Sequence, residues 1–513
     1  MKAILQIGNS GTDQGRRIRI VVSIVGLCAV LGSLATLVGC KLGPDYSRPS
    51  PLGQAAVPAA FGDQVVTNAG HWKTAEPSAN LPRGEWWTIY GDNELSRLEW
   101  QASTNNQQIA AALANFEQAR AAVGLARADF FPQVNLTPSA SRLRTSAKAQ
   151  PTGPSAGKSV TYNSFNLPAD AAWELDLWGG IHRQVEGARA AVTATVDEAE
   201  SVRLSVHAAV AIDYFMIRTL EAQYALLKET ADAYQKAFEL VASRRRAGVA
   251  TDLEVLQAET QLKSALSELP AVNLQLAQTR HALAVLCGLP STTFGIAPGV
   301  SLATNLPSIP VSVPSEWLES RPDIAAAERR MAAANAGIGV ANAAFYPRLT
   351  LGGTAGFESI GAGDILSWPS RLWAIGPSLR LPVFTGGRNQ AQLSSARAAY
   401  DGAVAQYRQT VLSGFQEVED QLAAQRLLAE QLEVERDALM SAQRTLAISN
   451  ARYQAGAEQY LDVIIAQTVE LAHRQNLVRL TGQKLAASVS LIKAQGGGGK
   501  LATIPDRQAG VTK

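Results

Sequence analysis

Two kinds of hydrophobic pattern alternate along the chain. Long stretches without proline repeat apolar residues at three- and four-residue spacing, which is typical of one face of a helix. Shorter stretches alternate apolar and polar residues one by one, which is typical of strands with two unlike faces. The chain is therefore predicted to combine very long helices with a few amphipathic strands. One helical stripe consists of Val404, Tyr407, Val411, Phe415, Val418 and Leu422.

The longest helices are predicted to form two helical hairpins, over residues 181–287 and 388–495. In each hairpin the first helix runs for more than 65 residues without a proline, which corresponds to about 100 Å. Each of these helices ends at a glycine, Gly248 or Gly456, where the backbone has the freedom that a tight reversal needs. Pro270 is expected to kink or divide the return helix of the first hairpin.

Four amphipathic strands are predicted, two before each hairpin. Their approximate bounds are 131–145 and 160–177 in the first half, and 346–360 and 372–384 in the second. The first of the four has the weakest alternation. A shorter alanine-rich helix precedes each pair of strands, over residues 96–129 and 323–343, and both helices stop before an aromatic–proline pair. The residue before a proline is pushed into extended conformations, which ends a helix.

The two halves of the chain read as a tandem duplication. Phe131-Pro132 matches Tyr346-Pro347, and the segments around Gly248 and Gly456 correspond at an offset of 208 residues. Each unit is predicted to run helix, strand, strand, long helix, helix. The predicted organisation is a signal peptide at 1–39, an acylated extended segment at 40–95, repeat 1 at 96–290, a linker at 291–320, repeat 2 at 321–495 and a flexible tail at 496–513.

The composition excludes several classes of protein. The 513 residues carry a formal net charge of +2, which does not favour a nucleic-acid binder. A mean hydropathy of −0.01 is too polar for a protein with many membrane-spanning helices. Three cysteines are too few for a disulfide scaffold. Cys287 lies in an apolar run, and we expect a buried structural thiol there.

The N-terminus is predicted to be an export signal. Arg16, Arg17 and Arg19 precede an apolar run, and this order is typical of a signal peptide, although about 19 apolar residues could also span a bilayer as a permanent anchor. The run ends in Val38-Gly39-Cys40, which resembles a bacterial lipobox. That resemblance implies cleavage before Cys40 and a diacylglycerol on its thiol. Lys41 stands where an aspartate commonly signals retention in the inner membrane, so we expect the outer membrane.

Four strands with a lipid-facing side cannot complete a membrane barrel on their own. Backbone groups in lipid must all be paired, so strands that cross a membrane form closed barrels, and such barrels begin at about eight strands. The chain is therefore expected to oligomerise, and three copies would supply about twelve strands.

Several motifs resemble one known family. They are Gly43-Pro44-Asp45-Tyr46, Trp86-Trp87, Trp173-Glu174-Leu175-Asp176 and Arg321-Pro322-Asp323. In this order the chain resembles the outer membrane factors, TolC-like channels, and in particular the NodT-type efflux lipoproteins. The resemblance covers the mature chain to about residue 495. It implies a mixed fold, in which a homotrimer closes a 12-stranded membrane β-barrel and a 12-helix α-helical barrel that crosses the periplasm.

The same resemblance implies partners and a gate. A periplasmic adaptor (membrane fusion) protein is expected to contact the hairpin tips at Gly248 and Gly456, and an inner-membrane pump, of RND type, to deliver the cargo. Asp462 is expected in an acidic ring at the tunnel mouth, where a solvated helix-surface aspartate is the alternative. Tyr453 and Glu254 are expected to hold the closed gate. Ile465 stands where many relatives carry a second aspartate.

Enzymatic chemistry finds no support in the sequence. The five histidines are scattered without a zinc-binding spacing, and no nucleophile-elbow motif is present. Gly157-Lys158-Ser159 lacks the earlier glycine of a phosphate-binding loop. We therefore expect no catalytic residue, no metal and no cofactor apart from the lipid on Cys40.

The expected function is that of a passive outer-membrane exit duct in a tripartite efflux system for small molecules. Two other functions stay open at this point. One is the outer-membrane duct of a type I protein secretion system, and the other is a structural coiled-coil lipoprotein that tethers the layers of the envelope. The alternating strands disfavour the tether, because a tether needs no lipid-facing barrel.

Overall fold

The computed structural model describes residues 41–53, 58, 84–149, 158–297, 317–318 and 320–497. The chain divides into two compact units, and each unit draws segments from both halves of the sequence. Unit 1 comprises Met1–Arg48, Gln118–Val192 and Arg329–Val404, and unit 2 comprises Pro49–Glu117, Thr193–Glu328 and Ala405–Lys513.

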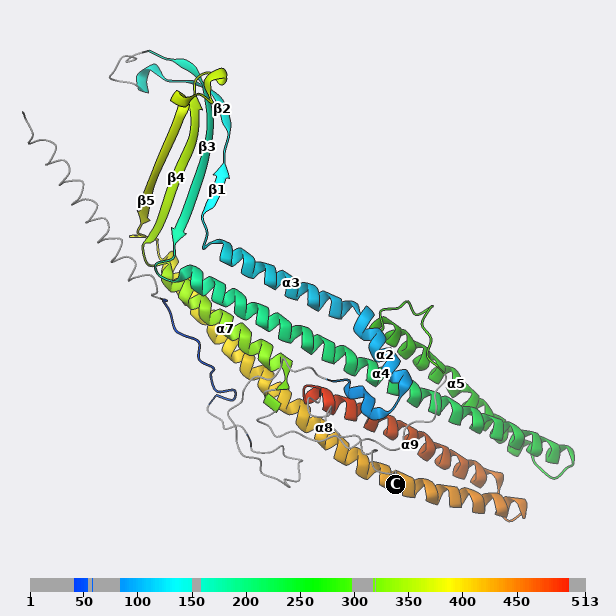
Figure 1. The fold of residues 1–513 in the computed structure, drawn as a ribbon. Helices are drawn as coiled ribbons and strands as arrows, with labels where there is room; N and C mark the ends of the chain where they lie inside the picture. The colour runs from blue at the N-terminus through cyan, green and yellow to red at the C-terminus, as the bar shows by residue number, and fades with distance from the viewer. Residues whose placement is uncertain are drawn as a thin grey trace, which may run out of the picture. The chain divides into compact units, whose positions relative to one another are not determined.

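Helices make up most of the described chain (Figure 1). A short 3-10 helix, η1 (Trp86–Tyr90), precedes two helices in the first half, and the remaining helices follow the predicted order. Their bounds are α2 Asn93–Asn105, α3 Gln107–Ala128, α4 Gly180–Arg246, α5 Asp252–Leu286, α7 Pro322–Ala343, α8 Arg388–Gln454 and α9 Tyr460–Ala494.

Unit 1 contains one antiparallel sheet in the order β1-β3-β4-β5, with β2 pairing to β3 beside β1. Figure 1 shows these strands side by side. The two long central strands meet in register along eleven residue pairs, from Phe165–Ser359 to Leu175–Leu349. The described sheet is therefore four strands wide, and its two outer positions are taken by β5 and by β1 with β2. The strands are β1 Gln133–Leu136, β2 Ser139–Arg144, β3 Thr161–Leu175, β4 Arg348–Ser359 and β5 Arg371–Arg380.

The first predicted strand is interrupted. Residues 131–145 form two short strands that both pair with β3, and the backbone N–H of Thr137 donates to the Pro168 carbonyl between them. Pro138 follows directly, and a proline has no N–H to donate to the ladder. This accounts for the weak alternation in the sequence there.

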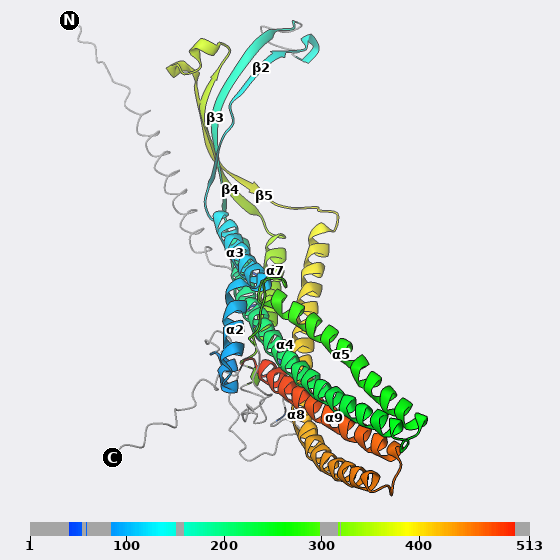
Figure 2. The ribbon, with the colours of Figure 1, turned by 90° about the vertical axis from the view of Figure 1, so that its right-hand side faces the viewer.

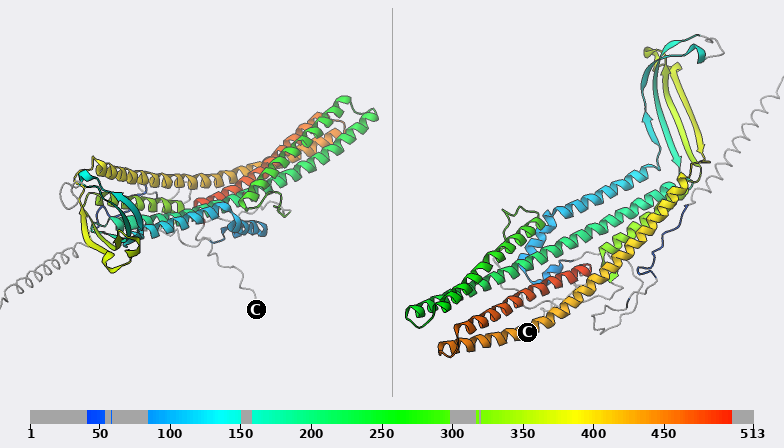
Figure 3. Two further views of the ribbon diagram at one scale, coloured as in Figure 1. Left: turned by 90° about the horizontal axis from the view of Figure 1, so that it is seen from above. Right: turned by 180° about the vertical axis from the view of Figure 1, so that it is seen from behind.

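The two helical hairpins have equal lengths. The long helices α4 and α8 each have 67 residues, and the return helices α5 and α9 each have 35. Every bound in the second hairpin lies 208 residues after its counterpart in the first. Figures 2 and 3 show the two antiparallel pairs, α4 with α5 and α8 with α9, and hydrogen bonds between α5 and α9 join them.

One helix prediction needs correction, and one of the two outcomes expected at Pro270 is excluded. The helix expected over 96–129 is divided at Asn106, whose backbone is extended and whose carboxamide oxygen accepts hydrogen bonds from the N–H groups of Gln108 and Ile109. The same side chain donates to the Leu286 carbonyl at 2.8 Å. Asn106 thus caps α3, as asparagine commonly does at a helix N-terminus. Pro270, by contrast, does not divide the first return helix, because α5 continues through it.

The helix start predicted at Arg321-Pro322-Asp323 is confirmed, with proline at the first helical position of α7. The Arg321 guanidinium is buried and donates to Asp323, to Glu417 of α8 and to the Ala494 carbonyl at the end of α9. Its charge is therefore compensated where it leaves water, as a buried cation requires. This arginine ties the start of α7 to the second hairpin within unit 2.

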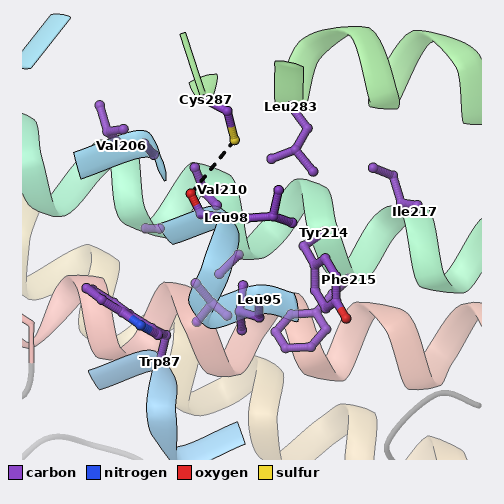
Figure 4. Close-up of a cluster of buried hydrophobic side chains, with 14 of the residues drawn as sticks. Trp87, Leu95, Leu98, Val206, Val210, Tyr214, Phe215, Ile217, Leu283 and Cys287 are labelled. Atoms are coloured by element: carbon purple, nitrogen blue, oxygen red, sulfur yellow. Dashed lines mark hydrogen bonds between the residues drawn. The ribbon is translucent and has the colours of Figure 1, made fainter. Parts of the chain in front are cut away.

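A large core cluster of unit 2 lies where η1, α2, α4 and the ends of α5 and α9 meet (Figure 4). Trp86 and Trp87, which stood out in the sequence, are both buried in it. The thiol of Cys287 lies 3.8 Å from the Leu98 carbonyl oxygen. Burial raises the pKa of this thiol to about 12, so the expectation of a buried, unreactive cysteine is confirmed.

Candidate functional site

Both hairpin turns have the same backbone geometry. Gly248 and Gly456 each have a φ of 75°, a left-handed conformation that favours glycine. The residue after each glycine donates a hydrogen bond of 2.9 Å to a carbonyl in the last turn of the long helix, Val249 to Arg244 and Ala457 to Arg452. This pattern closes a helix at its C-terminus. Both predicted turns are confirmed, and a Cβ added to either glycine would meet no described atom within 4 Å.

A small apolar cluster joins the two hairpins beside these turns. It combines Val241, Ala250 and Ala258 of the first hairpin with Tyr453, Tyr460 and Val463 of the second. We call it the turn cluster. It holds the ends of α4 and α8 together within unit 2.

Tyr453 is the polar centre of the turn cluster. Its ring lies 5.3 Å from that of Tyr460, and the Arg244 guanidinium lies 4.8 Å from its centroid. The Tyr453 hydroxyl is buried and has no hydrogen-bond partner in the described part of the chain. Burial raises the pKa of Tyr453. Tyr453 therefore contacts its neighbours through its ring and not through its hydroxyl. The phenol is neutral at physiological pH.

Glu254 lies close enough to Tyr453 for its charge to raise the pKa of the tyrosine, but the two side chains form no hydrogen bond. Its carboxylate accepts from the Thr251 N–H at 2.6 Å and from the Thr251 hydroxyl at 3.1 Å. Thr251 in turn caps the Glu254 N–H, which completes a capping box at the start of α5. Within one chain the charged group that contacts the Tyr453 ring is thus Arg244 and not Glu254.

Asp462 is the counterpart of Glu254 in the second hairpin, 208 residues further on, and it has a different environment. The residue before α9 is Gln459, whose side chain makes no capping bond. The half-buried Asp462 carboxylate has no hydrogen bond or ion pair to any residue that the structure describes. Ile465, one turn further along α9, is exposed. The two hairpins therefore differ at this position. The Glu254 carboxylate is engaged in hydrogen bonds, and the Asp462 carboxylate is unengaged.

Two arginines at the end of α4 have separate contacts. Arg244 packs on Tyr453, whereas Arg245 forms an ion pair with Asp252 at 2.6 Å. The pair lowers the pKa of Asp252 and links the two sides of the first turn. Positive charge here also complements the dipole of α4 at its C-terminus.

The sheet of unit 1 has two unlike faces, and the strand register aligns them. On one face Trp173 pairs with Leu351 and Ala355 with Trp373, while on the other Asp170 pairs with Thr354. The Thr354 hydroxyl donates to Asp170 at 2.7 Å. Exposed apolar side chains on the first face are Val134, Leu136, Trp173, Leu351, Trp373, Ile375 and Leu379.

Aromatic residues mark both ends of this apolar face. Along β3, Phe165 and Trp173 lie on the same side and eight residues apart, which is about 27 Å in an antiparallel strand. At the tilt of 35–45° that strands have in membrane barrels, this length rises about 20 Å, which is most of the apolar band of about 25 Å, bordered by aromatic residues, that such strands present to lipid. The geometry is that of a lipid-facing surface.

One buried polar pair was not anticipated from the sequence. The Glu99 carboxylate of α2 lies 2.6 Å from Nδ1 of His207 in α4, and the His207 ring stacks on Trp87 with centroids 4.6 Å apart. Burial raises the pKa of Glu99 well above its ordinary value and lowers that of His207 to about 4. His207 is therefore neutral at pH 7. A cavity of about 340 Å³ adjoins His207 and Trp87.

The remaining sequence predictions concern the lipid site, metal binding and membrane-spanning helices. Cys40 and the signal segment lie outside the described residues. No group of three or more metal-ligating side chains occurs among the residues described. Within the same part of the chain, no helix combines the length and apolar character needed to cross a membrane.

Sequence comparison decides the family. The outer membrane efflux protein family matches residues 100–289 and 313–497, which is well over half of the chain. This chain belongs to that family. The toluene efflux pump outer membrane protein TtgF of Pseudomonas putida is 32% identical over 90% of this chain and 95% of its own length. The cation efflux system protein CusC of Escherichia coli is 32% identical over 90% and 96%, respectively.

Solved structures agree with this assignment. The crystal structure of a membrane protein from Pseudomonas aeruginosa matches with a TM-score of 0.78 and 31% identity, over 89% of this chain and all of the other. The crystal structure of CusC, titled for transmembrane channel formation, matches with a TM-score of 0.77 and 30% identity, over 90% of this chain and all of the other. The efflux protein described here therefore has the fold of TolC-like outer-membrane channels, in which long helices and a β-sheet occur in one chain.

Proposed function

We propose that this protein is the outer-membrane exit duct of a tripartite efflux system and conducts small molecules passively out of a Gram-negative cell. The observation that carries the proposal is the sheet of unit 1, whose exposed apolar face is bordered by aromatic residues like the lipid-facing band of membrane strands. Family membership gives the outer-membrane location. The protein is a transport duct and not an enzyme, and the proposal includes no cofactor.

The working form in this proposal is a homotrimer. The sheet is four strands wide and ends in β5 on one side and in β1 with β2 on the other. Unpaired strand edges are costly in lipid, so the edges must pair with those of other copies. Three copies give a barrel of about twelve strands, and the four long helices of each copy give a twelve-helix tunnel. The equal lengths of the two hairpins support a tandem duplication as the origin of this arrangement.

The gate in this proposal lies at the hairpin turns. Adaptor contacts at the turns of Gly248 and Gly456 would move the two hairpins apart, and the turn cluster opposes that movement. Three Asp462 carboxylates would form a ring at the mouth of the tunnel. Like charges held close together attract cations and disfavour their own ionisation, so the ring would bias the duct toward cations.

The membrane anchor in this proposal is a lipid on Cys40 after cleavage of residues 1–39. The cargo would be chosen by the inner-membrane pump, since TtgF is named for toluene and CusC for cations although both resemble this chain to the same degree. A type I secretion duct is the second candidate, but the relatives named here belong to efflux systems.

Deletion of the gene tests the function. Loss of the duct is expected to sensitise cells to some members of a panel of solvents, dyes, antibiotics and metal ions, and the wild-type chain should restore resistance. Unchanged susceptibility to every compound, in a strain without a sister channel, would overturn the efflux role. Purified protein is expected to run as a heat-labile trimer and to form pores in planar bilayers.

A further inference from the structure

A buried arginine at the start of α4 holds the chain segment that follows Cys40. The Arg183 side chain is only 1% exposed. Its Nε donates to the Leu42 carbonyl at 2.9 Å, and its Nη2 donates to the Gly43 carbonyl at 3.0 Å and to Asp45 at 3.1 Å. Because the guanidinium is a rigid fork, it can bind several acceptors of one extended segment at once.

The charge of Arg183 is compensated from its own helix. Its Nη1 lies 3.2 Å from the Glu186 carboxylate, which also pairs with Lys41. A buried cation without such a partner would be costly. Glu186 thus connects the arginine to the first residue of the segment.

A second helix completes the site. Asn335 of α7 is buried and donates to the Pro44 carbonyl at 3.0 Å. Gly43 has a φ of +92°, and a Cβ there would lie 2.6 Å from the Gly339 Cα. A Cβ on Gly339 would lie 2.6 Å from Cγ of Arg183. The bare backbone of α7 at this position therefore lets both the arginine and the segment fit.

The site lies beside the connection from β3 to α4 in unit 1. The Leu42 N–H donates to the Trp178 carbonyl at 3.3 Å, and Nε1 of Trp178 donates to the Pro347 carbonyl at 2.8 Å, just before β4. The segment is therefore bonded to the same end of the sheet as Trp173, where the apolar face of β3 ends.

The second half of the chain lacks the site. At the offset of 208 residues that aligns Arg189 with Arg397, Arg183 corresponds to Ala391 and Glu186 to Ser394. Gly339 corresponds to Gly124, aligned by Phe131-Pro132 and Tyr346-Pro347. A Cβ on Gly124 would meet no described atom within 4 Å. The arginine therefore occurs only in the half that contacts residues 41–45. Only in that half would a side chain at the glycine position collide with its neighbours.

We propose that Arg183, Asn335 and Gly339 form a receptor for residues 41–45 and thereby fix the lipid anchor at the end of the sheet where β3 leads into α4. This inference rests on the proposed lipid at Cys40. Consecutive Cα atoms are about 3.8 Å apart, so the acylated residue follows directly from the bonded segment. The lipid and the strands are then presented to one membrane surface together. We call the three residues the anchor receptor.

Protease access to Lys41 tests the anchor receptor directly. Endoproteinase Lys-C cuts after lysine, and a cut at Lys41 removes the lipid together with two residues. Lys73 is the only lysine between Lys41 and Lys148, so a K73R background leaves Lys41 as the only such site before residue 148. Full-length protein labelled with palmitate in cells is digested in intact outer membranes, and the label that stays on the chain is followed over time.

The wild type is expected to keep its label, and R183A is expected to lose it at least about tenfold faster, because R183A removes three hydrogen bonds from a charged group to the segment. R183K should lie between them, since lysine keeps the charge and loses the fork. Equal loss of label from the wild type and R183A would overturn the receptor. Absence of label from the wild type would instead overturn the lipid at Cys40.

A matched pair of glycine variants controls for effects of misfolding. G339A places a methyl group against Arg183, whereas G124A places one in open space at the equivalent position. Alanine is otherwise the better helix former, so both chains should assemble. G339A is expected to lose label like R183A, and G124A like the wild type. Identical behaviour of the two alanine variants would count against the receptor.

A double-mutant cycle separates positioning from general stability. R183A is expected to slow the appearance of heat-labile trimer after a pulse of synthesis severalfold. In a C40A background, where no lipid can be attached, R183A should slow it no further. If R183A has its full effect without the lipid, then the arginine only stabilises the fold and the proposal is wrong.

Discussion

The Arg244 guanidinium, in the last turn of α4, lies 4.8 Å from the ring centroid of Tyr453, in the last turn of α8. This contact joins the two hairpins beside their turns, within the turn cluster. A cation over an aromatic face contributes about 0.5–2 kcal/mol. In the proposed trimer the contact occurs three times and opposes separation of the hairpins.

Substitution of Arg244 is expected to loosen the gate. R244A should raise the single-channel conductance in planar bilayers severalfold, as should Y453A, because each removes one partner of the contact. Y453F should behave like the wild type, since the Tyr453 hydroxyl has no hydrogen-bond partner in the described chain. A conductance of Y453F as high as that of R244A would show that the hydroxyl, and not the ring, holds the gate.

Asp462 and Glu254 form a matched pair for testing ion selectivity. D462N is expected to reduce the preference for cations, measured as the reversal potential across a salt gradient, because the unengaged carboxylate is removed. E254Q should leave the potential unchanged, since glutamine can replace glutamate in a capping box. If both variants shift the potential equally, Asp462 has no special place at the tunnel mouth.

Ile375 and Ala374 are neighbours on β5 with opposite orientations. Ile375 is 72% exposed on the apolar face, while Ala374 pairs with Thr354 on the polar face. An arginine facing lipid costs about 2–4 kcal/mol near the middle of a membrane. I375R is therefore expected to lower the yield of heat-labile trimer strongly and A374R only slightly. The reverse order would assign the faces of the sheet the other way round.

The thiol content tests processing and burial together. The full sequence has three cysteines, and the mature lipoprotein would keep one free thiol, Cys287. Because that thiol is buried with a pKa near 12, native protein should not react with a maleimide at pH 8. Protein unfolded in hot detergent should bind one maleimide per chain, as determined by mass spectrometry. Two or three per chain would show that Cys40 carries no lipid or that Cys28 is retained.

The buried pair of Glu99 and His207 predicts a pH effect on stability. The folded-state pKa of His207, about 4, lies below its ordinary value of 6.5. As the pH falls through this interval the unfolded chain binds a proton that the native chain does not, which destabilises the native state by about 1.4 kcal/mol per pH unit. Relative to the wild type, H207Q should therefore gain thermal stability between pH 6.5 and pH 4.

Glu99 contributes with the opposite sign, because its raised pKa favours the native state at low pH and this advantage is lost as the pH rises above 4.5. The comparison between H207Q and the wild type mainly reports the histidine, since Glu99 is present in both and glutamine can keep a hydrogen bond to its carboxylate. The midpoint of trimer dissociation on heating measures the difference. An equal pH dependence in the two proteins would contradict a neutral, buried His207.

Patterns that depend on neighbouring residues were predictable from the sequence. The hairpins follow from apolar spacing without proline and from glycines that only a left-handed turn requires, and both turns lie where the sequence placed them. The strands β3, β4 and β5 follow from strict alternation, since one face of each meets a different environment from the other. The pattern that determines each of these elements lies within the element itself and does not depend on residues far away in the sequence.

Features that depend on distant residues were not predictable. Asn106 divides a helix partly through a bond to the Leu286 carbonyl, 180 residues away in sequence. Glu99 and His207 are 108 residues apart, and nothing near either one marks it as half of a buried pair. Arg183 reads as an ordinary residue in the first turn of a helix, because the acceptors that it binds belong to residues 42–45.

The constant offset of 208 residues between the two hairpins also determines how many hairpin turns, and of how many kinds, a trimer would contain. A trimer built from chains with two similar halves has six hairpin turns around its axis but only threefold symmetry, because the turns alternate between two kinds. One kind has an engaged carboxylate at Glu254, and the other an unengaged one at Asp462. A ring-shaped partner that contacts all six turns must accept two different surfaces in alternation. Any single substitution therefore alters three of the six contacts and leaves the other three as an internal reference.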